Sequence, residues 1–198
     1  MPKRSTWADG WWRGAAPRPS PNHGPRPTGS AVNLAVVHAI SLPPGHWGGD
    51  AVERFFTNTL DLSAHPYFQS LQGRRVSAHF FIRRSGRMLQ FVSCDRRAWH
   101  AGVSSWQGRD NCNDWSIGIE LEGLDGQTFG GAQYTALAQL LKVLSRRYEL
   151  VAAVGHEHIA PGRKFDPGPG FEWQRLRRAM RCARPQLVPR LGHLSTPG

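Results

Sequence analysis

WSIGIELEG, residues 115–123, is the stretch of sequence that decides the fold. Apolar residues alternate in it with polar or small ones, and this period of two is that of a β-strand. Ile117, Ile119 and Leu121 share one face of the predicted strand, which belongs to a hydrophobic core. The opposite face carries Ser116, Gly118, Glu120 and Glu122. These carboxylates lie either at a sheet edge that faces water or in a cleft, and the pattern leaves both alternatives open.

Further strands and helices are predicted on both sides of this stretch. Short apolar runs are typical of buried strands, an RRSGR turn between two such runs predicts a hairpin, and apolar residues at helical spacing predict helices. The predicted strands span residues 31–40, 76–82, 88–92 and 150–155, and the predicted helices span 48–60, 132–148 and 171–182. Because strands and helices mix without internal repeats, we expect a single α/β domain with a central mixed β-sheet flanked by helices.

Length and charge define the expected domain organisation. The 198 residues suffice for one domain with a sizeable core, and 39% hydrophobic content indicates a folded protein. The net charge of +11 is concentrated at the ends: residues 1–30 carry five Lys or Arg against one acidic residue, and residues 171–198 carry six Arg against one. We therefore predict an irregular, basic, Pro-rich arm over residues 1–30, a domain that holds the chemistry over 31–182 and a flexible tail over 183–198.

Cysteine usage and hydropathy bear on the compartment. Cys94, Cys112 and Cys182 show no CxxC spacing and are too few for a disulfide scaffold, so we interpret them as thiols in a reducing compartment. The sequence has no apolar core of signal-peptide length and no run that approaches a membrane span. We expect a cytoplasmic protein that does not bind membranes, with a monomer as the default.

VGHEHIAPGRKFDPGPG, residues 154–170, concentrates ionisable side chains among prolines and glycines. A catalytic zinc site needs three protein ligands and one open position. His156 at a strand end and Asp166 ten residues later are candidate ligands, and His38 at another strand end is the best candidate for the third. The chain has nine histidines, and many histidines are structural, so spacing alone leaves this set open. Lys164 is either solvated or placed to stabilise developing negative charge.

Five runs of residues carry a resemblance to a known family. They are VVHAISLPPG (36–45), AHPYF (64–68), VSAHFFIRRSG (76–86), RRAWHAGVSSWQGRDNCNDWSIGIELEG (96–123) and GHEHIAPGRKFDPGPGF (155–171). In this order they resemble the zinc-dependent N-acetylmuramoyl-L-alanine amidases of the cytoplasmic, 1,6-anhydro type. The same class includes phage lysozyme-type amidases and peptidoglycan recognition proteins. Several motifs that agree in order make the resemblance specific.

The resemblance implies both the fold and the reaction. The fold is that of peptidoglycan recognition proteins. The reaction is hydrolysis of the amide between the lactyl group of (1,6-anhydro)-N-acetylmuramic acid and L-alanine, in peptidoglycan recycling. The implied site residues are His38, His156 and Asp166 as Zn²⁺ ligands, Glu120 as the catalytic carboxylate that takes a proton from water, and Lys164 as the group that stabilises charge on the amide oxygen. Glu157 and His158 match no required position of the family.

Substrate contacts are predicted from the positions of residues relative to the motifs. Arg75 is chosen as an anchor for a peptide carboxylate, because the family substrate carries such groups. His79 and His100 fall in segments that line the family's cleft, and we expect them to contact the substrate. Family members commonly have Asn where Ala39 stands and Arg where Asn111 stands. Both changes remove polar contacts, so the peptide preference is left open.

Three alternatives compete with a cytoplasmic amidase. A module that binds murein without cutting it typically lacks part of the metal set, which is complete here. An amidase that acts on the intact wall outside the cytoplasm fits the basic ends but not the absence of a signal peptide. A nucleic-acid binder needs a basic face, whereas the central residues 31–170 carry a net charge of only +2.

Overall fold

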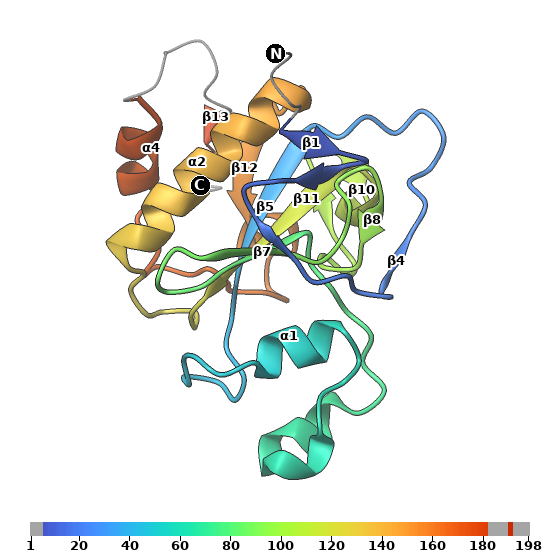
Figure 1. Cartoon of the computed structure of the whole chain (residues 1–198). Helices are drawn as coiled ribbons and strands as arrows, with labels where there is room; N and C mark the ends of the chain where they lie inside the picture. The colour runs from blue at the N-terminus through green and yellow to red at the C-terminus, as the bar shows by residue number, and fades with distance from the viewer. Residues whose placement is uncertain (1–5, 182–189, 192–198) are drawn as a thin grey trace, which may run out of the picture.

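The computed structural model describes residues 6–181 and 190–191, and within them a seven-stranded sheet lies at the centre of the molecule (Figure 1). The strand order is β13-β12-β5-β11-β6-β7-β3. These strands are β3 (Ala16–Pro17), β5 (Leu34–Ile40), β6 (Phe80–Ile82), β7 (Met88–Gln90), β11 (Ser116–Glu122), β12 (Ala152–Gly155) and β13 (Arg190–Leu191). β12, β5, β11 and β6 run parallel, and β7 is antiparallel to β6. The mixed sheet and the hairpin predicted from the sequence are therefore confirmed.

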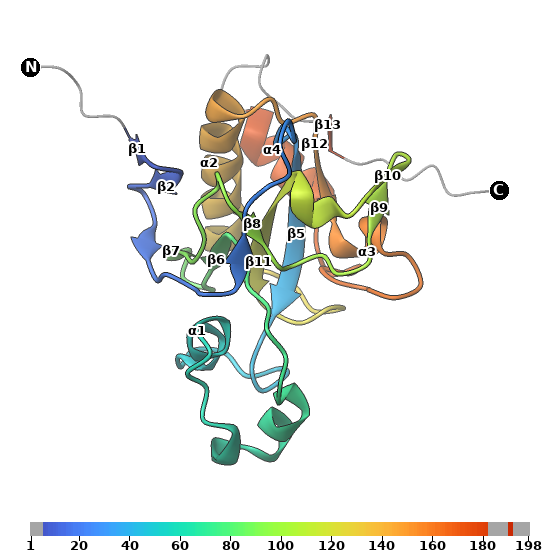
Figure 2. The ribbon, with the colours of Figure 1, turned by 90° about the vertical axis from the view of Figure 1, so that its right-hand side faces the viewer.

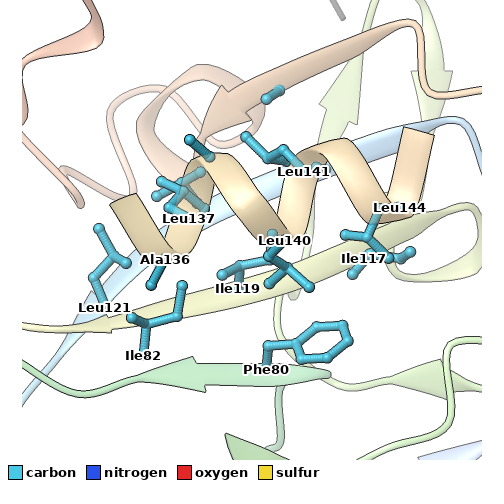
Figure 3. Close-up of a cluster of buried hydrophobic side chains, with 14 of the residues drawn as sticks. Phe80, Ile82, Ile117, Ile119, Leu121, Ala136, Leu137, Leu140, Leu141 and Leu144 are labelled. Carbon is cyan, nitrogen blue, oxygen red and sulfur yellow. The ribbon is translucent and has the colours of Figure 1, made fainter. Parts of the chain in front are cut away.

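Helices α2 (Gly131–Arg147) and α4 (Trp173–Arg181) pack side by side, and α2 covers one face of the sheet (Figures 1 and 2). Figure 3 shows the contact, in which the apolar stripe of α2 faces β11 and β6. Its buried members include Leu137, Leu140, Leu141 and Leu144, which belong to one cluster with Ile117, Ile119 and Leu121. The period-two pattern of residues 115–123 therefore places its apolar face against this helix, as predicted.

The opposite face of β11 is also buried, because loop residues such as His100 pack over Ser116 and Gly118. In the parallel register Glu120 lies beside His38 of β5, and Gly155 of β12 lies beside Val37. His156, the residue after Gly155, therefore lies near His38 at the C-terminal ends of the strands. Equivalent ends of parallel strands meet at one edge of a sheet, so residues far apart in the sequence converge here.

Short helices lie beyond this end of the sheet. Helix α1 (Ala51–Phe56) and the 3₁₀ helices η1 (Leu62–Ala64) and η2 (Pro66–Leu71) project from it in both views (Figures 1 and 2). The remaining elements are β8 (Arg97–Ala98), β9 (Ser105–Trp106), β10 (Arg109–Asp110), η3 (Cys112–Asp114) and α3 (His156–Ile159). The helix predicted over residues 48–60 is therefore shorter than expected, because Gly48 and Gly49 adopt positive φ and Thr57 ends it.

The N-terminal segment is more regular than the irregular arm that the sequence predicts. It forms β1 (Trp7–Ala8), β2 (Trp11–Trp12), β3 and β4 (His23–Gly24), of which β3 joins the central sheet. Trp12 is buried in the main core. The Arg26 guanidinium donates to the main-chain oxygens of Cys94, Asp114 and Ser116. A tryptophan and an arginine thus anchor a segment whose Pro and Gly content predicts a loose arm. Of the tail expected over residues 183–198, only residues 190–191 are described, as β13.

Two other expectations concern cysteines and membranes. Cys94 and Cys112 are buried free thiols, and Cys182 lies outside the described residues. Among the described helices, none combines the length and the hydropathy that a membrane span requires.

We predict that Leu140→Ala lowers the free energy of unfolding by about 2–5 kcal/mol, because it leaves a cavity between α2 and the sheet. Gln139→Ala on the exposed side of the same helix is the matched control and should change it by less than about 0.5 kcal/mol. Urea denaturation followed by circular dichroism measures both. Equal effects of the two substitutions would contradict the packing described here.

Candidate active site

A cleft of about 470 Å³ opens at the C-terminal ends of β5 and β11. The end of β5 and the loop after it form one wall, the α1–η2 segment forms the second and the loop over residues 163–166 forms the third. Its lining includes His38, Tyr67, Arg74, His100, Glu120, His156, Lys164 and Asp166. The cleft therefore collects most of the ionisable residues that the sequence analysis singled out.

His38, His156 and Asp166 form a group that could hold a metal ion, with one ligand atom from each lying within 4.8 Å of the others. The Nδ1 atoms of the two histidines are 2.9 Å apart. Asp166 Oδ2 lies 3.3 Å from His38 Nδ1 and 3.2 Å from His156 Nδ1. A strand, the first residue of α3 and a loop each contribute one of the three side chains, so the tertiary fold assembles the group.

The electrostatics of this group favour a bound cation. Burial, followed by the nearby His156, lowers the pKa of His38 to about 4, so its imidazole is neutral near pH 7. Burial opposes ionisation of Asp166, but the contacts with His156 and His38 outweigh it and hold its pKa well below the usual range. His156 Nε2 donates to the main-chain oxygen of Ala101, at 3.2 Å, which leaves the Nδ1 lone pair facing the group. Imidazole nitrogen and carboxylate oxygen are the ligand types that zinc takes in catalytic sites.

Glu120 settles the alternative that the strand pattern left open. Its side chain is buried beside His38 and lines the cleft, so it does not sit at a sheet edge. Its Oε2 atom is buried without a hydrogen-bond partner. Burial first, and then the charge of Asp166, raise its pKa well above the usual value, which Lys164 partly offsets. A buried carboxylate with a free oxygen in a cleft is suited to accept a proton.

Glu122, on the same face of β11, has a different environment. Its carboxylate accepts hydrogen bonds from the main-chain nitrogens of Gly48 and Arg84, at 2.8 and 2.9 Å. It also pairs with the Arg83 guanidinium at 3.1 Å. All its interactions join it to the hairpin and the loop before α1, so we assign Glu122 to the structure rather than to the chemistry.

Lys164 lies half-buried in the wall of the cleft. Its charge acts to lower the pKa of both Glu120 and His38, which places it within electrostatic reach of the candidate site. His158 lies apart: its Nδ1 accepts from the Gly155 main-chain nitrogen at 2.8 Å, within the first turn of α3. The structure therefore groups Lys164 with the site and leaves His158 outside it.

The residues predicted to contact substrate occupy three different environments. His100 lines the cleft, but its Nδ1 lies 2.9 Å from His38 Nε2 and its Nε2 lies 3.1 Å from Ser116 Oγ. His79 is fully buried: Gly118 N donates to its Nδ1, and its Nε2 donates to the main-chain oxygen of Arg96. With both nitrogens occupied by protein, neither histidine offers a free polar atom to a ligand in this structure.

Arg75 is exposed and lines a smaller neighbouring cavity of about 180 Å³ rather than the cleft. Its neighbour Arg74 lines both, and Arg163 is a second arginine in the cleft wall. The predicted anchor Arg75 therefore lies beside the cleft rather than in its lining. The sequence analysis singled out neither Tyr67 nor Phe165, which are 38% and 64% exposed and line the cleft.

Comparison with known proteins fits this geometry. The family model for N-acetylmuramoyl-L-alanine amidase (Amidase_2) matches residues 28–169. The chain belongs to the N-acetylmuramoyl-L-alanine amidase family. The 1,6-anhydro-N-acetylmuramyl-L-alanine amidase AmpD of Citrobacter freundii is 52% identical over 171 residues, which are 85% of this chain and 91% of that protein. This match confirms the resemblance and the class of enzyme, a hydrolase of amide bonds, predicted from the sequence.

Solved structures of amidases extend the comparison to the fold. A crystal structure of a selenomethionine derivative of AmpD superposes with a TM-score of 0.84 at 50% identity, and covers 87% of this chain and 97% of its own. Pseudomonas aeruginosa AmpDh3 in complex with anhydromuramic pentapeptide gives a TM-score of 0.56 at 34% identity, over 77% of this chain and 61% of its own. The α/β amidase fold predicted from the sequence is thereby confirmed.

We predict that the metal-free amidase loses stability between pH 6.5 and pH 5, partly through His79. Burial, and then the charge of Arg26, lower the pKa of His79 to about 3, while the unfolded chain binds a proton near pH 6.5. Between these values the unfolded state holds more protons than the folded state. For this one group the free energy of unfolding therefore falls by about 1.4 kcal/mol for each unit by which the pH is lowered. His79→Asn keeps an acceptor for Gly118 N and removes the titration. Urea denaturation at several pH values measures the free energy of unfolding, which should change less with pH in the variant than in the wild type. The same pH dependence in both proteins would contradict the assignment.

Proposed function

We propose that this amidase hydrolyses the amide between the lactyl group of 1,6-anhydro-N-acetylmuramic acid and L-alanine, with Zn²⁺ held by His38, His156 and Asp166. The observation that carries the proposal is one cleft that contains three converging ligand atoms and, beside them, a buried carboxylate oxygen without a partner. The substrate class is supported by the 1,6-anhydro activity in the name of the C. freundii relative and by the ligand in the AmpDh3 complex.

The donor set supports zinc as the metal in this proposal. Two imidazole nitrogens and one carboxylate oxygen form a three-ligand site with room for a fourth position, which is the composition of many catalytic zinc sites. Magnesium and calcium prefer sites made of oxygen ligands, so two histidines argue against them. Zinc, when bound, lowers the pKa of a water ligand to about 7 and polarises a carbonyl group.

Glu120 acts in this proposal as the proton carrier. It accepts a proton from the attacking water and passes it to the amine nitrogen of L-alanine as the amide bond breaks. Its pKa is raised chiefly by burial, which makes its carboxylate a stronger base toward water. The same shift keeps the proton on the carboxyl group until the amine nitrogen accepts it. The strand position beside His38 fixes its direction.

In this proposal Lys164 and the arginines interact with negative charges of the substrate. The Lys164 ammonium stabilises the negative charge that grows on the amide oxygen, and the loss of one such contact commonly costs about 3–4 kcal/mol. Arg75 beside the cleft and Arg74 in its wall are our candidates for binding a peptide carboxylate, because guanidinium and carboxylate groups pair in a bidentate manner. The predicted roles of His79 and His100 in substrate binding are not retained, since protein atoms occupy their ring nitrogens.

We further propose that the enzyme acts as a monomer in the cytoplasm, on muropeptides released from the wall. The two buried free thiols fit a reducing compartment such as the cytoplasm. A product of wall breakdown with a 1,6-anhydro sugar is a small soluble molecule, and a cleft of about 470 Å³ is of the size that holds one.

The central experiment incubates the purified amidase with an anhydromuropeptide and follows release of the free peptide by mass spectrometry. We expect cleavage that stops when a chelator removes the metal and returns when Zn²⁺ is added. Cleavage that persists without metal would contradict the zinc site. Binding without cleavage would instead support a murein-binding module, and matching turnover on intact wall would support a wall amidase.

We predict that Glu120→Gln lowers turnover by about 10²–10⁴-fold and leaves zinc content unchanged, because it removes the proton acceptor and keeps the shape of the side chain. Glu122→Gln is the matched control two residues along β11; it should lower stability through its lost ion pair with Arg83 and keep most of the turnover. Kinetics below the melting temperature of each variant test this. Similar turnover in both variants would remove Glu120 from its role.

We predict that Asp166→Asn weakens zinc binding strongly, because an amide oxygen is a neutral and poorer ligand than a carboxylate. Asp125→Asn is the control, since Asp125 is an exposed carboxylate in the cleft lining outside the ligand group. Metal content after dialysis against a weak chelator distinguishes them. Wild-type zinc content in Asp166→Asn would mean that another residue completes the site.

A further inference from the structure

The outer nitrogens of the two candidate imidazole ligands are both bonded to one short segment, residues 100–101. His38 Nε2 lies 2.9 Å from His100 Nδ1, and His156 Nε2 lies 3.2 Å from the main-chain oxygen of Ala101. The inner nitrogens, both Nδ1, face Asp166. Consecutive residues of a segment that contributes no ligand thus contact both ligands from behind.

The hydrogen bonds beyond His100 determine which nitrogen of His38 carries the proton. The Ser116 hydroxyl donates its proton to the main-chain oxygen of Cys112. Its oxygen must therefore accept from His100 Nε2, at 3.1 Å, and the His100 proton lies on that nitrogen. His100 Nδ1 is then an acceptor, and the proton of His38 lies on Nε2. The consequence is a lone pair on His38 Nδ1, the atom that faces Asp166.

The second ligand is oriented more directly. A main-chain oxygen only accepts, so Ala101 places the proton of His156 on Nε2 and the lone pair on Nδ1. The Arg163 guanidinium also donates to this oxygen, at 2.7 Å, and an oxygen has two lone pairs that accommodate both donors. Both imidazoles therefore present the same nitrogen to the ligand group, by two independent routes.

The segment itself is held by neighbouring residues. Asn113 Oδ1 accepts from the main-chain nitrogens of His100 and Ala101, at 3.0 and 2.9 Å. Gly118 of β11 provides space for the His100 ring, because a Cβ atom built at this position would lie 2.4 Å from His100 Cγ. The ring is 9% exposed and is confined by these contacts.

We infer that residues 100–101 form a clamp that sets the tautomer and the direction of both imidazole ligands, with His100, Ser116 and Asn113 as positioning residues. The inference rests on the metal site of the proposed function and adds residues that do not touch the metal. A metal ligand bonded at its outer nitrogen is held in one tautomer and one orientation, and loss of such partners typically costs 10–100-fold in metal affinity. His100 is thus a positioning residue and not a substrate contact.

Two substitutions of His100 separate the hydrogen bond from packing. His100→Phe keeps a ring of similar size and removes the acceptor for His38 Nε2. His100→Asn removes the ring and keeps an amide oxygen near the place of Nδ1. We expect the zinc dissociation constant, measured by chelator competition, to rise about 10–100-fold for His100→Phe and much less for His100→Asn. Equal affinities in the two variants, whether weak or unchanged, would overturn the inference.

Ser116→Ala removes fewer atoms than either substitution of His100 and therefore disturbs the folded structure less. It removes the acceptor for His100 Nε2, so His100 no longer prefers the tautomer that orients His38, and zinc affinity should fall. Ser20→Ala is the matched control: Ser20 is also buried and donates to the main-chain oxygen of Phe56, away from the site. A loss of affinity in Ser116→Ala alone supports the clamp, and unchanged affinity in both variants overturns it.

Nitrogen-15 NMR of the imidazoles gives a readout that does not depend on activity. In the metal-free wild type we expect His38, His100 and His156 to carry their protons on Nε2. In Ser116→Ala and His100→Phe, His38 should show a mixture of tautomers, while His156 should stay as in the wild type. A single Nε2-protonated His38 in both variants would overturn the inference. Absence of zinc binding by the wild type would overturn the proposed function together with it, whereas tight wild-type binding with unaffected variants overturns the clamp alone.

Discussion

Three electron-pair donors, His38 Nδ1, His156 Nδ1 and the Asp166 carboxylate, converge at one end of the sheet, and the rest of the site depends on this contact. Two neutral imidazole lone pairs and a carboxylate repel one another when no proton or cation lies between them. Burial makes a proton on His38 costly, because its pKa falls to about 4. A divalent cation relieves this repulsion, and binding to the folded state alone stabilises the fold as well.

The two faces of the central strands divide the tasks of stability and chemistry. One face is packed against a helix, and the other carries the polar side chains of the site. On one face β11 presents Ile117, Ile119 and Leu121 to helix α2 (Figure 3). On the other, polar side chains at alternate positions are covered by loops that satisfy them, as for Ser116, or confined in the cleft, as for Glu120. Hydrophobic packing on one face thus offsets the unfavourable free energy of burying the Glu120 oxygen without a hydrogen-bond partner on the other face.

Sequence patterns predicted the fold well where the spacing of apolar residues corresponds to the buried face of an element, as in the period-two strand of residues 115–123 and the apolar stripe of α2. The N-terminal segment is more regular than its composition predicts, because Trp12 and Arg26 make contacts with distant residues. For the site, spacing alone left the ligand set open, and the family resemblance supplied the roles. The substrate contacts stay predictions, because the exposure of Arg74, Arg75 and His79 to the cleft depends on tertiary packing that no local pattern encodes.

Charge balance links the ligand group to Glu120. The carboxylates of Glu120 and Asp166 lie close enough to influence each other: the charge of Asp166 raises the pKa of Glu120, whereas the pKa of Asp166 itself lies well below its usual range. Lys164 only partly offsets the effects of burial and of Asp166 on Glu120, so the proton of Glu120 is held more tightly. Two carboxylates of the same chemistry thereby acquire separate roles through their surroundings: one stays charged and is suited to a cation, and the other is suited to exchange a proton. This division needs both the strand register that places Glu120 beside His38 and the loop that brings the Asp166 carboxylate to His38 Nδ1.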